Sequence, residues 1–443
     1  MSIPPAKGEP SKSFFIDMIT RDLGLTDCIL DLIDNAVDIA VARSAADVMG
    51  LLTNGKHRAL FRDATISLRI SAHEFLIEDT CGGISIADAT ERVFRFGTPG
   101  TREGAPGLSV YGIGMKRAFF KLGERIEVQS ATAREWFRID IDVPTWQSQD
   151  AWDFPFTDQG PSSQGDLGKR PGTRIRIRRL REGIGRRLSQ ASFQNQLVSK
   201  IAATYALFLA AGLRIRVGDE DVKSALPTLG SYRDLDTARK VISQQGVQIL
   251  IIAGVTPYED RTPRGWYVFC NGRMLLEADR SSLTGWGETV PQWHTKFGHF
   301  VGYVYFKSED VRLLPWTTTK QGVVFESPVY QGALAEMQVQ SRPVLRFLTD
   351  MYPGEQTPEG VQEREVLKKA QSLAIDKIPR AETAFAVRAT RDKKSDEARS
   401  VRIQYSKTLK EIDRVRRCLN KPRMSASAVG EHTFDYFVKQ ECE

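Results

Sequence analysis

The order of apolar and polar positions predicts alternating helices and strands in the first part of the chain. Between about residues 14 and 48, apolar residues recur at helical spacing, with one interruption near Gly24. The segments 65–70 (TISLRI) and 74–79 (EFLIED) are short apolar runs, which favours strands. We therefore expect helices packed on a sheet.

A glycine-rich stretch and a clean alternation follow. Residues 96–112 are rich in Gly, Pro and Thr and too long for a simple turn, which predicts a functional loop. The next segment, IGMKRAFFKLG, predicts a short helix with Gly123 as its C-cap. Residues 144–171 are polar and rich in Gly, Pro and Ser, and are predicted to be a polar excursion, a long connection between strands. Residues 172–180 alternate Ile with Arg, which predicts a strand with one apolar and one basic face.

Two further parts are predicted beyond residue 190. Residues 193–212 form an apolar-faced helical pattern, several apolar strands lead to about residue 326, and charged amphipathic helices dominate the remainder. The predicted fold class is α/β, with α+β character. The predicted parts are an α/β domain over 1–190, a second α/β domain over 191–345 and a mainly helical region over 346–443.

Composition and charge narrow the function without deciding it. A length of 443 residues predicts two or three domains, and a net charge of +7 permits an acidic partner such as nucleic acid without requiring one. The five cysteines are scattered, which argues against a zinc site or a disulfide framework and favours a cytoplasmic location. The sequence predicts neither a secretory signal nor a membrane span.

The stretch DCILDLIDNAVDIA (27–40) places polar side chains in an apolar helix. Asp31, Asn35 and Asp38 share one helical face, and the apolar residues around them leave little room for a purely solvent-facing stripe. An Asn oxygen suits Mg²⁺, which takes phosphate oxygens and waters as its other ligands. A carboxylate one turn earlier can orient or deprotonate a water.

Two glycine-containing stretches could contact a nucleotide. In LIEDTCGGIS, Asp79 ends a strand beside glycines, so its carboxylate could accept from an exocyclic amine while a flat ring lies against the backbone. In GLSVYGIGMK, Gly107, Gly112 and Gly114 precede a helix, an arrangement that favours a phosphate. Each stretch alone is more typical of an ordinary turn.

Taken together, these stretches resemble the GHKL ATPases, which include DNA gyrase B, MutL, the ninety-kilodalton heat-shock chaperones, MORC proteins and the histidine-kinase catalytic domain. DLIDNAVD resembles the first motif of that family, DTCGGI the second, YGIGMK the third, and Gly172-Thr173 the fourth. The resemblance implies a Bergerat-fold α/β sandwich that binds ATP and Mg²⁺. The nearest likeness of the whole chain is to the prokaryotic chaperone-like, MORC-like and MutL-like branch.

The resemblance also implies a role for each matching residue. Asn35 would bind Mg²⁺ and Asp79 the adenine amine, while residues 96–114 would form a lid. The remaining nucleotide-binding positions that it implies are Asp38 in the first motif, Gly83 and Ile84 below the adenine, Gly112, Gly114 and Lys116 at the phosphates, and Thr173 through a water.

The second predicted domain resembles the transducer domain of MutL-like members. The similarity lies in YVFCNGRML (267–275) and in the loop LPWTTTKQG (314–322). By this match Lys320 would reach the γ-phosphate. The alternative is an exposed surface lysine.

Two departures from the family pattern matter for activity. Cys81 stands where the second motif usually has glycine. Asp31 stands where most hydrolysing members carry glutamate, and its carboxylate reaches about 1.5 Å less far from the backbone. We therefore expect firm ATP binding and slow hydrolysis, with Asp31 and Lys320 as the catalytic candidates.

The leading hypothesis is an ATP-operated switch that forms a nucleotide-dependent homodimer, a clamp around a DNA or protein client. The basic segment 169–187 could follow a phosphate backbone, although a strand face balanced by acids elsewhere is favoured. The alternative function is a non-hydrolysing regulatory subunit, or a chaperone-like protein, in a multi-gene system such as phage defence. A histidine kinase is rejected, because no histidine precedes the first motif.

Overall fold

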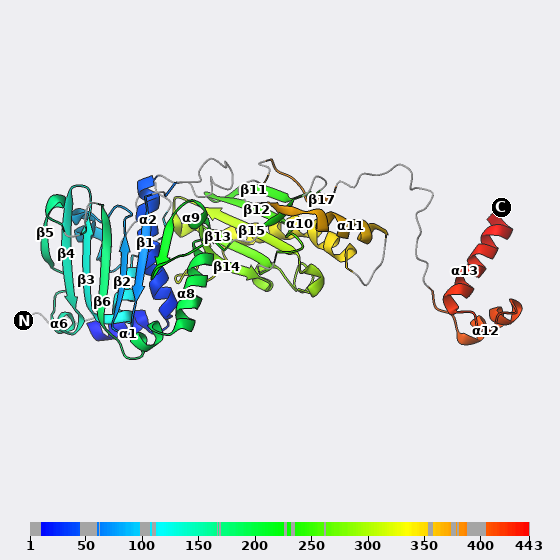
Figure 1. Cartoon of the computed structure of the whole chain (residues 1–443), viewed down its shortest axis with the longest axis horizontal. Helices are drawn as coiled ribbons and strands as arrows, with labels where there is room; N and C mark the ends of the chain where they lie inside the picture. Colours follow the sequence, from blue (N-terminus) through cyan, green and yellow to red (C-terminus); the bar gives the residue numbers. More distant parts are fainter. Residues whose placement is uncertain are drawn as a thin grey trace, which may run out of the picture. The chain divides into compact units, whose positions relative to one another are not determined.

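The computed structural model describes residues 10–44, 60–61, 63–97, 107–108, 112–165, 167, 170–225, 228–231, 235–260, 263–352, 358–373, 378, 381–387 and 405–442. The chain divides into two compact units, Met1–Arg388 and Ala389–Glu443. Figure 1 shows the elements of each unit. Within the described residues, none of the helices has the length and apolar character needed to cross a bilayer.

The first sheet of unit 1 has eight strands within the described residues, in the order β5-β4-β3-β6-β2-β1-β7-β8. Its strands are β1 (Thr65–Ile70), β2 (Glu74–Asp79), β3 (Gly123–Ala131), β4 (Glu135–Asp142), β5 (Phe156–Pro161), β6 (Gly172–Leu180), β7 (Arg214–Val217) and β8 (Glu220–Asp221). Neighbours are antiparallel except β1 and β7, which are parallel. The sheet therefore continues past residue 190, because β7 and β8 lie at its edge.

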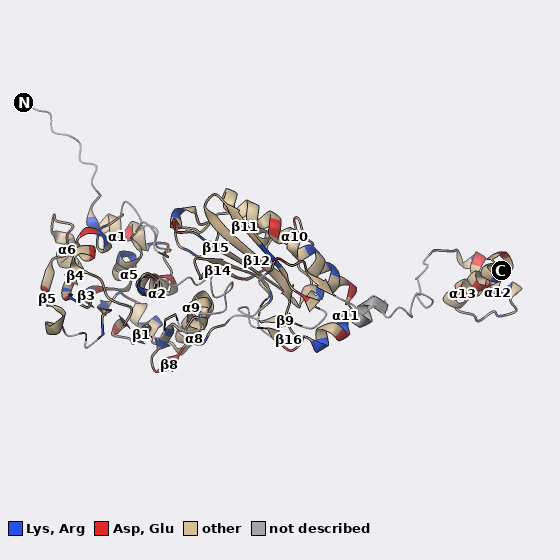
Figure 2. Ribbon diagram, turned by 90° about the horizontal axis from the view of Figure 1, so that it is seen from above, with Lys and Arg blue, Asp and Glu red and all other residues tan. Residues whose placement is uncertain are grey.

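Helices cover one face of this sheet, and charged residues cover the other. In Figure 2, α1 (Lys12–Thr20), α2 (Leu25–Ser44) and α5 (Gly114–Leu122) lie on one side of β1, β3 and β4. The apolar face of β6 points to this core, as the alternation predicted, because Ile175 and Ile177 are buried. The arginines of its other face pair with acids: Arg174 with Glu78, Arg176 with Glu74, and Arg178 with Glu127.

The stretch predicted as a polar excursion is more ordered than its composition suggested. Residues 144–171 contribute most of α6 (Val143–Ser148) and all of β5. The reason is a group of aromatic side chains among its polar residues, with Trp146 stacked on Phe120 and on Phe154. The prediction missed this group because the aromatic residues follow no regular period.

Gly123 ends α5 as predicted, but in a different conformation. Its φ of −166° is extended, so the chain passes directly into β3 without a left-handed cap. A Cβ at this position would lie 2.7 Å from the Ile177 side chain and 2.9 Å from the carbonyl oxygen of Arg178. Glycine is therefore required here for the close approach of β3 to β6.

A second sheet of unit 1 has the order β11-β12-β15-β13-β14 within the described residues. Its strands are β11 (Ala238–Gln244), β12 (Val247–Val255), β13 (Gly265–Cys270), β14 (Arg273–Asp279) and β15 (Phe300–Lys307). The long helix α10 (Pro328–Asp350) packs on β11, β12 and β15, whereas α8 (Ala191–Thr204) and α9 (Ala206–Ala210) contact β14. These two helices place the second sheet beside the first.

The stretch GWYVFCNGRML (265–275), which lies among the predicted apolar strands, is a hairpin between β13 and β14. Asn271 and Gly272 form its turn with φ angles of 46° and 89°. Asn-Gly is the preferred dipeptide for a two-residue hairpin turn, because both positions need positive φ. Asn271, in the turn, contacts Gly107, and Arg273, which follows it, contacts Asp34 on α2.

The region beyond residue 345 is less purely helical than predicted. After α11 (Pro358–Lys369), the short strands β16 (Gln371–Leu373) and β17 (Ala386–Val387) pair with β9 (Leu229–Ser231) and β10 (Leu235–Asp236). These pairings hold the chain to unit 1 up to residue 387.

Unit 2 contains α12 (Leu409–Cys418) and α13 (Ala426–Phe437), followed by a π-helical turn at Val438–Cys442. Thr408 and Glu411 form a capping box on α12, and Ser425 caps α13. Of the apolar residues of α13, Val429 is buried, whereas Phe434 and Phe437 are exposed. The sequence of residues 389–400 predicts an exposed linker or a fraying helix, and these residues lie outside the described part of the chain.

Candidate functional site

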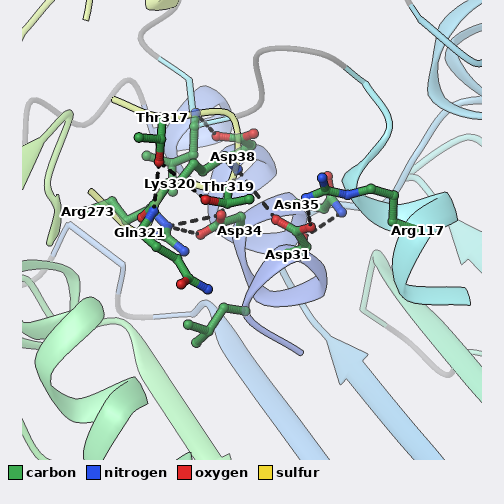
Figure 3. Close-up of polar contacts among 12 residues, drawn as sticks. Asp31, Asp34, Asn35, Asp38, Arg117, Arg273, Thr317, Thr319, Lys320 and Gln321 are labelled. Atoms are coloured by element: carbon green, nitrogen blue, oxygen red, sulfur yellow. Dashed lines mark hydrogen bonds and ion pairs between the residues drawn. The ribbon is translucent and has the colours of Figure 1, made fainter. Parts of the chain in front are cut away.

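Helix α2 carries four polar side chains at the centre of unit 1. Asp31 and Asp34 are buried, with exposed fractions of 6% and 0%, whereas Asn35 and Asp38 are half-buried. Figure 3 shows Asp31 and Asn35 toward α5, and Asp34 toward the second sheet. The helix therefore faces two different parts of the protein with its polar residues.

Asp34 lies at the contact between α2 and the second sheet. Its carboxylate accepts from Nε of Arg273 at 3.0 and 3.1 Å, from Nζ of Lys320 at 2.7 Å and from the hydroxyl of Tyr205 at 2.7 Å. The Tyr205 hydroxyl also lies 2.9 Å from the carbonyl oxygen of Leu30, one turn earlier on α2. A buried carboxylate needs such partners, because desolvation is costly for an unpaired charge.

Asp31 lies between two cations. Nη2 of Arg117, on α5, is 3.1 Å from Oδ2 of Asp31, and Nζ of Lys320 is 4.0 Å from Oδ1. A Cβ at Gly114 would lie 3.0 Å from Cγ of Asp31. Glycine at the first residue of α5 therefore makes room for this carboxylate at the helix N-terminus.

The two carboxylates differ in proton affinity. Burial raises the pKa of Asp31 above its ordinary value, because the nearby Asp34 adds to the effect and Lys320 and Arg117 oppose it only in part. Burial also favours a higher pKa for Asp34, but Arg273 and Lys320 lower its pKa below the ordinary value. Asp31 is thus the better proton acceptor, and Asp34 is a fixed negative charge.

Asn35 and Asp38 make contacts that set their orientation. Nδ2 of Asn35 donates to the carbonyl oxygen of Asp31 at 2.8 Å, so the amide oxygen is the end turned away from the helix backbone. Oδ1 of Asp38 accepts from the backbone N–H of Leu108. Gly107, the preceding residue, accepts from Nδ2 of Asn271 at 3.0 Å, so these two residues join α2 to the β13–β14 turn.

The side-chain oxygen of Asn35 is a suitable ligand for Mg²⁺ but cannot by itself complete the coordination of the metal. Within the described part of the chain, no cluster of three or more His, Cys, Asp or Glu side chains is arranged to hold a metal ion. Mg²⁺ is often bound by one or two protein oxygens together with phosphate oxygens and waters. The Asn35 oxygen therefore suits a metal ion whose other ligands are the phosphate oxygens of a bound nucleotide or similar ligand and waters.

Asp79 ends β2 in a half-buried position. Its Oδ1 accepts from the backbone N–H of Cys81 at 2.8 Å. Burial raises the pKa of Asp79 to about 7, although backbone hydrogen bonds from Cys81 and Thr173 oppose the rise. Gly83 has a φ of 73°, and a Cβ there would lie 2.0 Å from the carbonyl oxygen of Ala131. With Cys81 at the first glycine position of the second motif, Gly83 still forms a tight turn beside Asp79, whose raised pKa makes its carboxylate unusually basic.

Ser130 connects the other residues predicted for this side of the site. Its hydroxyl accepts from the backbone N–H of Ile84 at 2.7 Å and lies 2.9 Å from the hydroxyl of Thr173. Sequence reasoning missed Ser130. A signal was present, because Ser130 occupies the core-facing position that follows Ile126 and Val128 along β3.

The Lys116 side chain does not extend toward Asn35. It is buried, and Nζ donates to the carbonyl oxygens of Val93 at 2.7 Å and of Gly112. Burial lowers the pKa of Lys116 to about 7. Lys116 therefore contacts the backbone before the predicted lid, at Val93, and near the end of that lid, at Gly112, whereas Arg117 is the cation of this helix that contacts Asp31.

The structure brings the predicted residues into two neighbouring groups, around α2 with α5 and around the end of β2. Most of the predicted lid, 98–106 and 109–111, lies outside the described residues. Sequence reasoning missed Arg117, Tyr205 and Arg273, since their contacts join segments far apart in the chain. Arg273 stood in the Asn-Gly-Arg stretch but was given no role.

Comparison with known families finds a match in the first part of the chain. Residues 24–168 match the family model described as histidine kinase-, DNA gyrase B-, and HSP90-like ATPase. A search of curated proteins finds no match to the chain. The matched segment contains α2, Asp79 and α5 but ends before Thr173 and before the second sheet.

Proposed function

Residues 24–168 form a GHKL-type ATPase domain, and on this premise we propose that the protein is an ATP-operated switch. It binds Mg·ATP between α2 and α5, hydrolyses ATP slowly and passes the nucleotide state to the second sheet. The observation that carries the proposal is the buried charge cluster of α2. Its members come from both sheets' domains: Asp31, Asp34, Arg117, Arg273 and Lys320.

The charges of this cluster favour an anion. Two carboxylates face three cations, which leaves one net positive charge in a region of low dielectric. The N-terminus of α5 lies beside Asp31, and a helix N-terminus attracts phosphate through its N–H groups and dipole. We propose that Gly112 and Gly114 meet the phosphates there, and that Asp38 lies in the wall of the same site.

The base would bind at the other end of the site. Asp79 accepts from the adenine amine, Gly83 and Ile84 lie below the ring, and Thr173 contacts it through a water. In this proposal the phosphates would lie near Asn35, whose oxygen would hold Mg²⁺. The metal neutralises phosphate charge when bound.

In the hydrolytic step, a water oxygen bonds to the γ-phosphorus as the bond to the bridging oxygen breaks. ADP leaves with that electron pair, and Asp31 accepts the proton of the water. The raised pKa of Asp31 suits a base, but Arg117 pairs with one of its oxygens at 3.1 Å and Lys320 lies 4.0 Å from the other. These two pairs support slow turnover, and they equally favour the alternative, an ATP-binding regulatory subunit that does not hydrolyse.

Calorimetry with ATP in the presence and absence of Mg²⁺, followed by a phosphate-release assay, tests the proposal on the full chain. We expect Mg²⁺-dependent binding with one nucleotide per chain and turnover well below the median enzyme rate of about 10 per second. Binding without turnover selects the regulatory alternative. Failure to bind adenine nucleotides contradicts the proposed function.

We further propose that the ATPase domain includes β7 and β8, and that the second sheet with α10 is the transducer domain. The order of strands supports this boundary, near residue 225 in place of 190. The helical region beyond residue 345 then divides between the transducer and unit 2.

The switch is proposed to act as a nucleotide-dependent homodimer in the cytoplasm. Phe14 and Met18, one turn apart on α1, are 60% and 56% exposed, and an exposed apolar pair of this kind favours association. Light scattering after size exclusion checks this on the full chain. A non-hydrolysable ATP analogue is expected to double the mass, whereas Phe14→Ser should keep it monomeric. A molar mass that is the same with and without the analogue would contradict the nucleotide-dependent homodimer.

A DNA or protein client is proposed for the clamp. The arginines of β6 are already paired with acids, which favours a protein client over a phosphate backbone along this face. DNA affinity that falls steeply with salt would reverse this preference.

Nucleotide affinity is expected to depend on pH through Asp79. An adenine amine donates to the ionised carboxylate, so binding favours ionised Asp79. Because the pKa of Asp79 is about 7 in the absence of nucleotide, affinity should be constant above pH 8 and fall about tenfold per unit below pH 6. ADP titrations from pH 5 to 9 measure this. Asp79→Asn should retain only the slope of the phosphates, which titrate near pH 6; identical slopes in both proteins would rule Asp79 out.

A further inference from the structure

We propose that Asp34 sets the discrimination between ATP and ADP, by competing with the γ-phosphate for the ammonium group of Lys320. This inference rests on the proposed function, in which Lys320 contacts the γ-phosphate. Asp34 itself would touch no nucleotide atom. Its effect would be exerted through the position of Lys320.

The position of the Lys320 ammonium group is the first observation. Nζ lies 2.7 Å from Oδ2 of Asp34 and 4.0 Å from Oδ1 of Asp31. Figure 3 shows both carboxylates on the same helix and Lys320 reaching them from the 314–322 loop. A small displacement of one ammonium group therefore moves it from Asp34 toward the face that carries Asp31 and Asn35.

The second observation is that Asp34 does not depend on Lys320 alone. Arg273 donates from Nε to both carboxylate oxygens, and the Tyr205 hydroxyl donates to Oδ1. When Lys320 leaves, Asp34 keeps a buried cation and a hydroxyl donor. The release of Lys320 is thus far less costly than leaving a buried carboxylate with no partner.

The third observation is that the backbone of Lys320 is fixed. Its carbonyl oxygen accepts from Nη1 of Arg273 at 2.6 Å, and its N–H donates to the carbonyl oxygen of Thr317 at 2.9 Å. Trp316 and Val323 form a β-bridge across the same loop. The ammonium group can therefore change partner by rotation of the side chain, without movement of the loop.

These contacts imply different costs for the two nucleotides. ATP offers Lys320 an anionic γ-phosphate but must first break its pair with Asp34. ADP offers no γ-phosphate, so Lys320 stays on Asp34. The Asp34–Lys320 pair consequently weakens ATP binding without affecting ADP binding, and keeps the resting protein linked across its two sheets.

The test measures the dissociation constants of ADP and of a non-hydrolysable ATP analogue, with Mg²⁺, on the full chain. Asp34→Asn keeps the shape of the side chain and removes the charge that holds Lys320. It should tighten analogue binding about tenfold, the effect expected for one charge-assisted hydrogen bond, and change ADP binding less than twofold. In a Lys320→Met background the same substitution should change neither constant.

A matched control comes from Lys240, which pairs with Glu382 at 2.8 Å on the exposed side of the second sheet. Glu382→Gln breaks this pair and should leave the ratio of the two constants unchanged. Equal effects of Asp34→Asn on both nucleotides, or the same effect in the Lys320→Met background, would overturn the inference.

Folding of the variants is checked by thermal unfolding. If Asp34→Asn does not fold, Lys320→Met alone decides, because the inference requires it to lower the preference for the analogue over ADP about tenfold, and an unchanged preference overturns it. A native chain that binds neither nucleotide refutes the proposed function itself, a result distinct from any of these.

Discussion

Replacement of Asn35 by alanine is expected to abolish Mg·ATP binding at micromolar nucleotide. The amide oxygen is the proposed protein ligand of Mg²⁺, and the described residues offer no cluster of His, Cys, Asp or Glu that could hold the metal in its place. Without the metal, the phosphate charges remain unneutralised beside Asp31 and Asp38. We expect calorimetry to show an affinity loss of 100-fold or more, equivalent to about 2.7 kcal/mol or more.

The fold should survive this substitution. Asn35 is half-buried, and its side chain donates a hydrogen bond to the carbonyl oxygen of Asp31. That bond contributes about 1 kcal/mol, and the higher helix propensity of alanine offsets about half of it. Asn195→Ala, at an exposed position of α8, is the matched control and should leave affinity and melting temperature unchanged. Unchanged Mg·ATP affinity in Asn35→Ala would contradict the assignment of the metal site.

Much of this site could be predicted because its chemistry is local in sequence. The spacing of Asp31, Asn35 and Asp38 places them along one side of α2 whatever the rest of the chain does. The same holds for the strand that ends at Asp79 and for the glycines before α5. Strands β1 and β2 were likewise predicted at their observed boundaries.

The contacts that join the two sheets could not be predicted. Asp34 was not among the predicted site residues, and nothing local in the sequence shows that Arg273 and Tyr205 contact it. Lys320 lies 286 residues from Asp34. Lys116 was placed at the phosphates by the resemblance of YGIGMK to the third motif of the family. Burial against Val93 and Gly112 decides its position instead.

Replacement of Asp31 by asparagine is expected to stop ATP turnover and to leave ATP binding intact. Asparagine keeps the shape of the side chain but cannot accept the water proton, and general-base catalysis contributes about 10²–10⁴-fold. The loss of a negative charge beside the phosphates should hold affinity constant or increase it. Phosphate release under single-turnover conditions measures the first effect and calorimetry the second. Asp22→Asn, at an exposed position before α2, is the control.

The companion substitution Asp31→Glu tests the reach of the carboxylate. The extra methylene moves the carboxylate about 1.5 Å further from the helix and so changes its distances to Arg117 and Lys320, the two cations beside Asp31 in the resting protein. If these pairs and the short side chain limit the rate, Asp31→Glu should hydrolyse ATP faster than the native protein. Undiminished phosphate release by Asp31→Asn would remove Asp31 from the mechanism, and a slower Asp31→Glu would show that the chain is built around the shorter acid and its two cations.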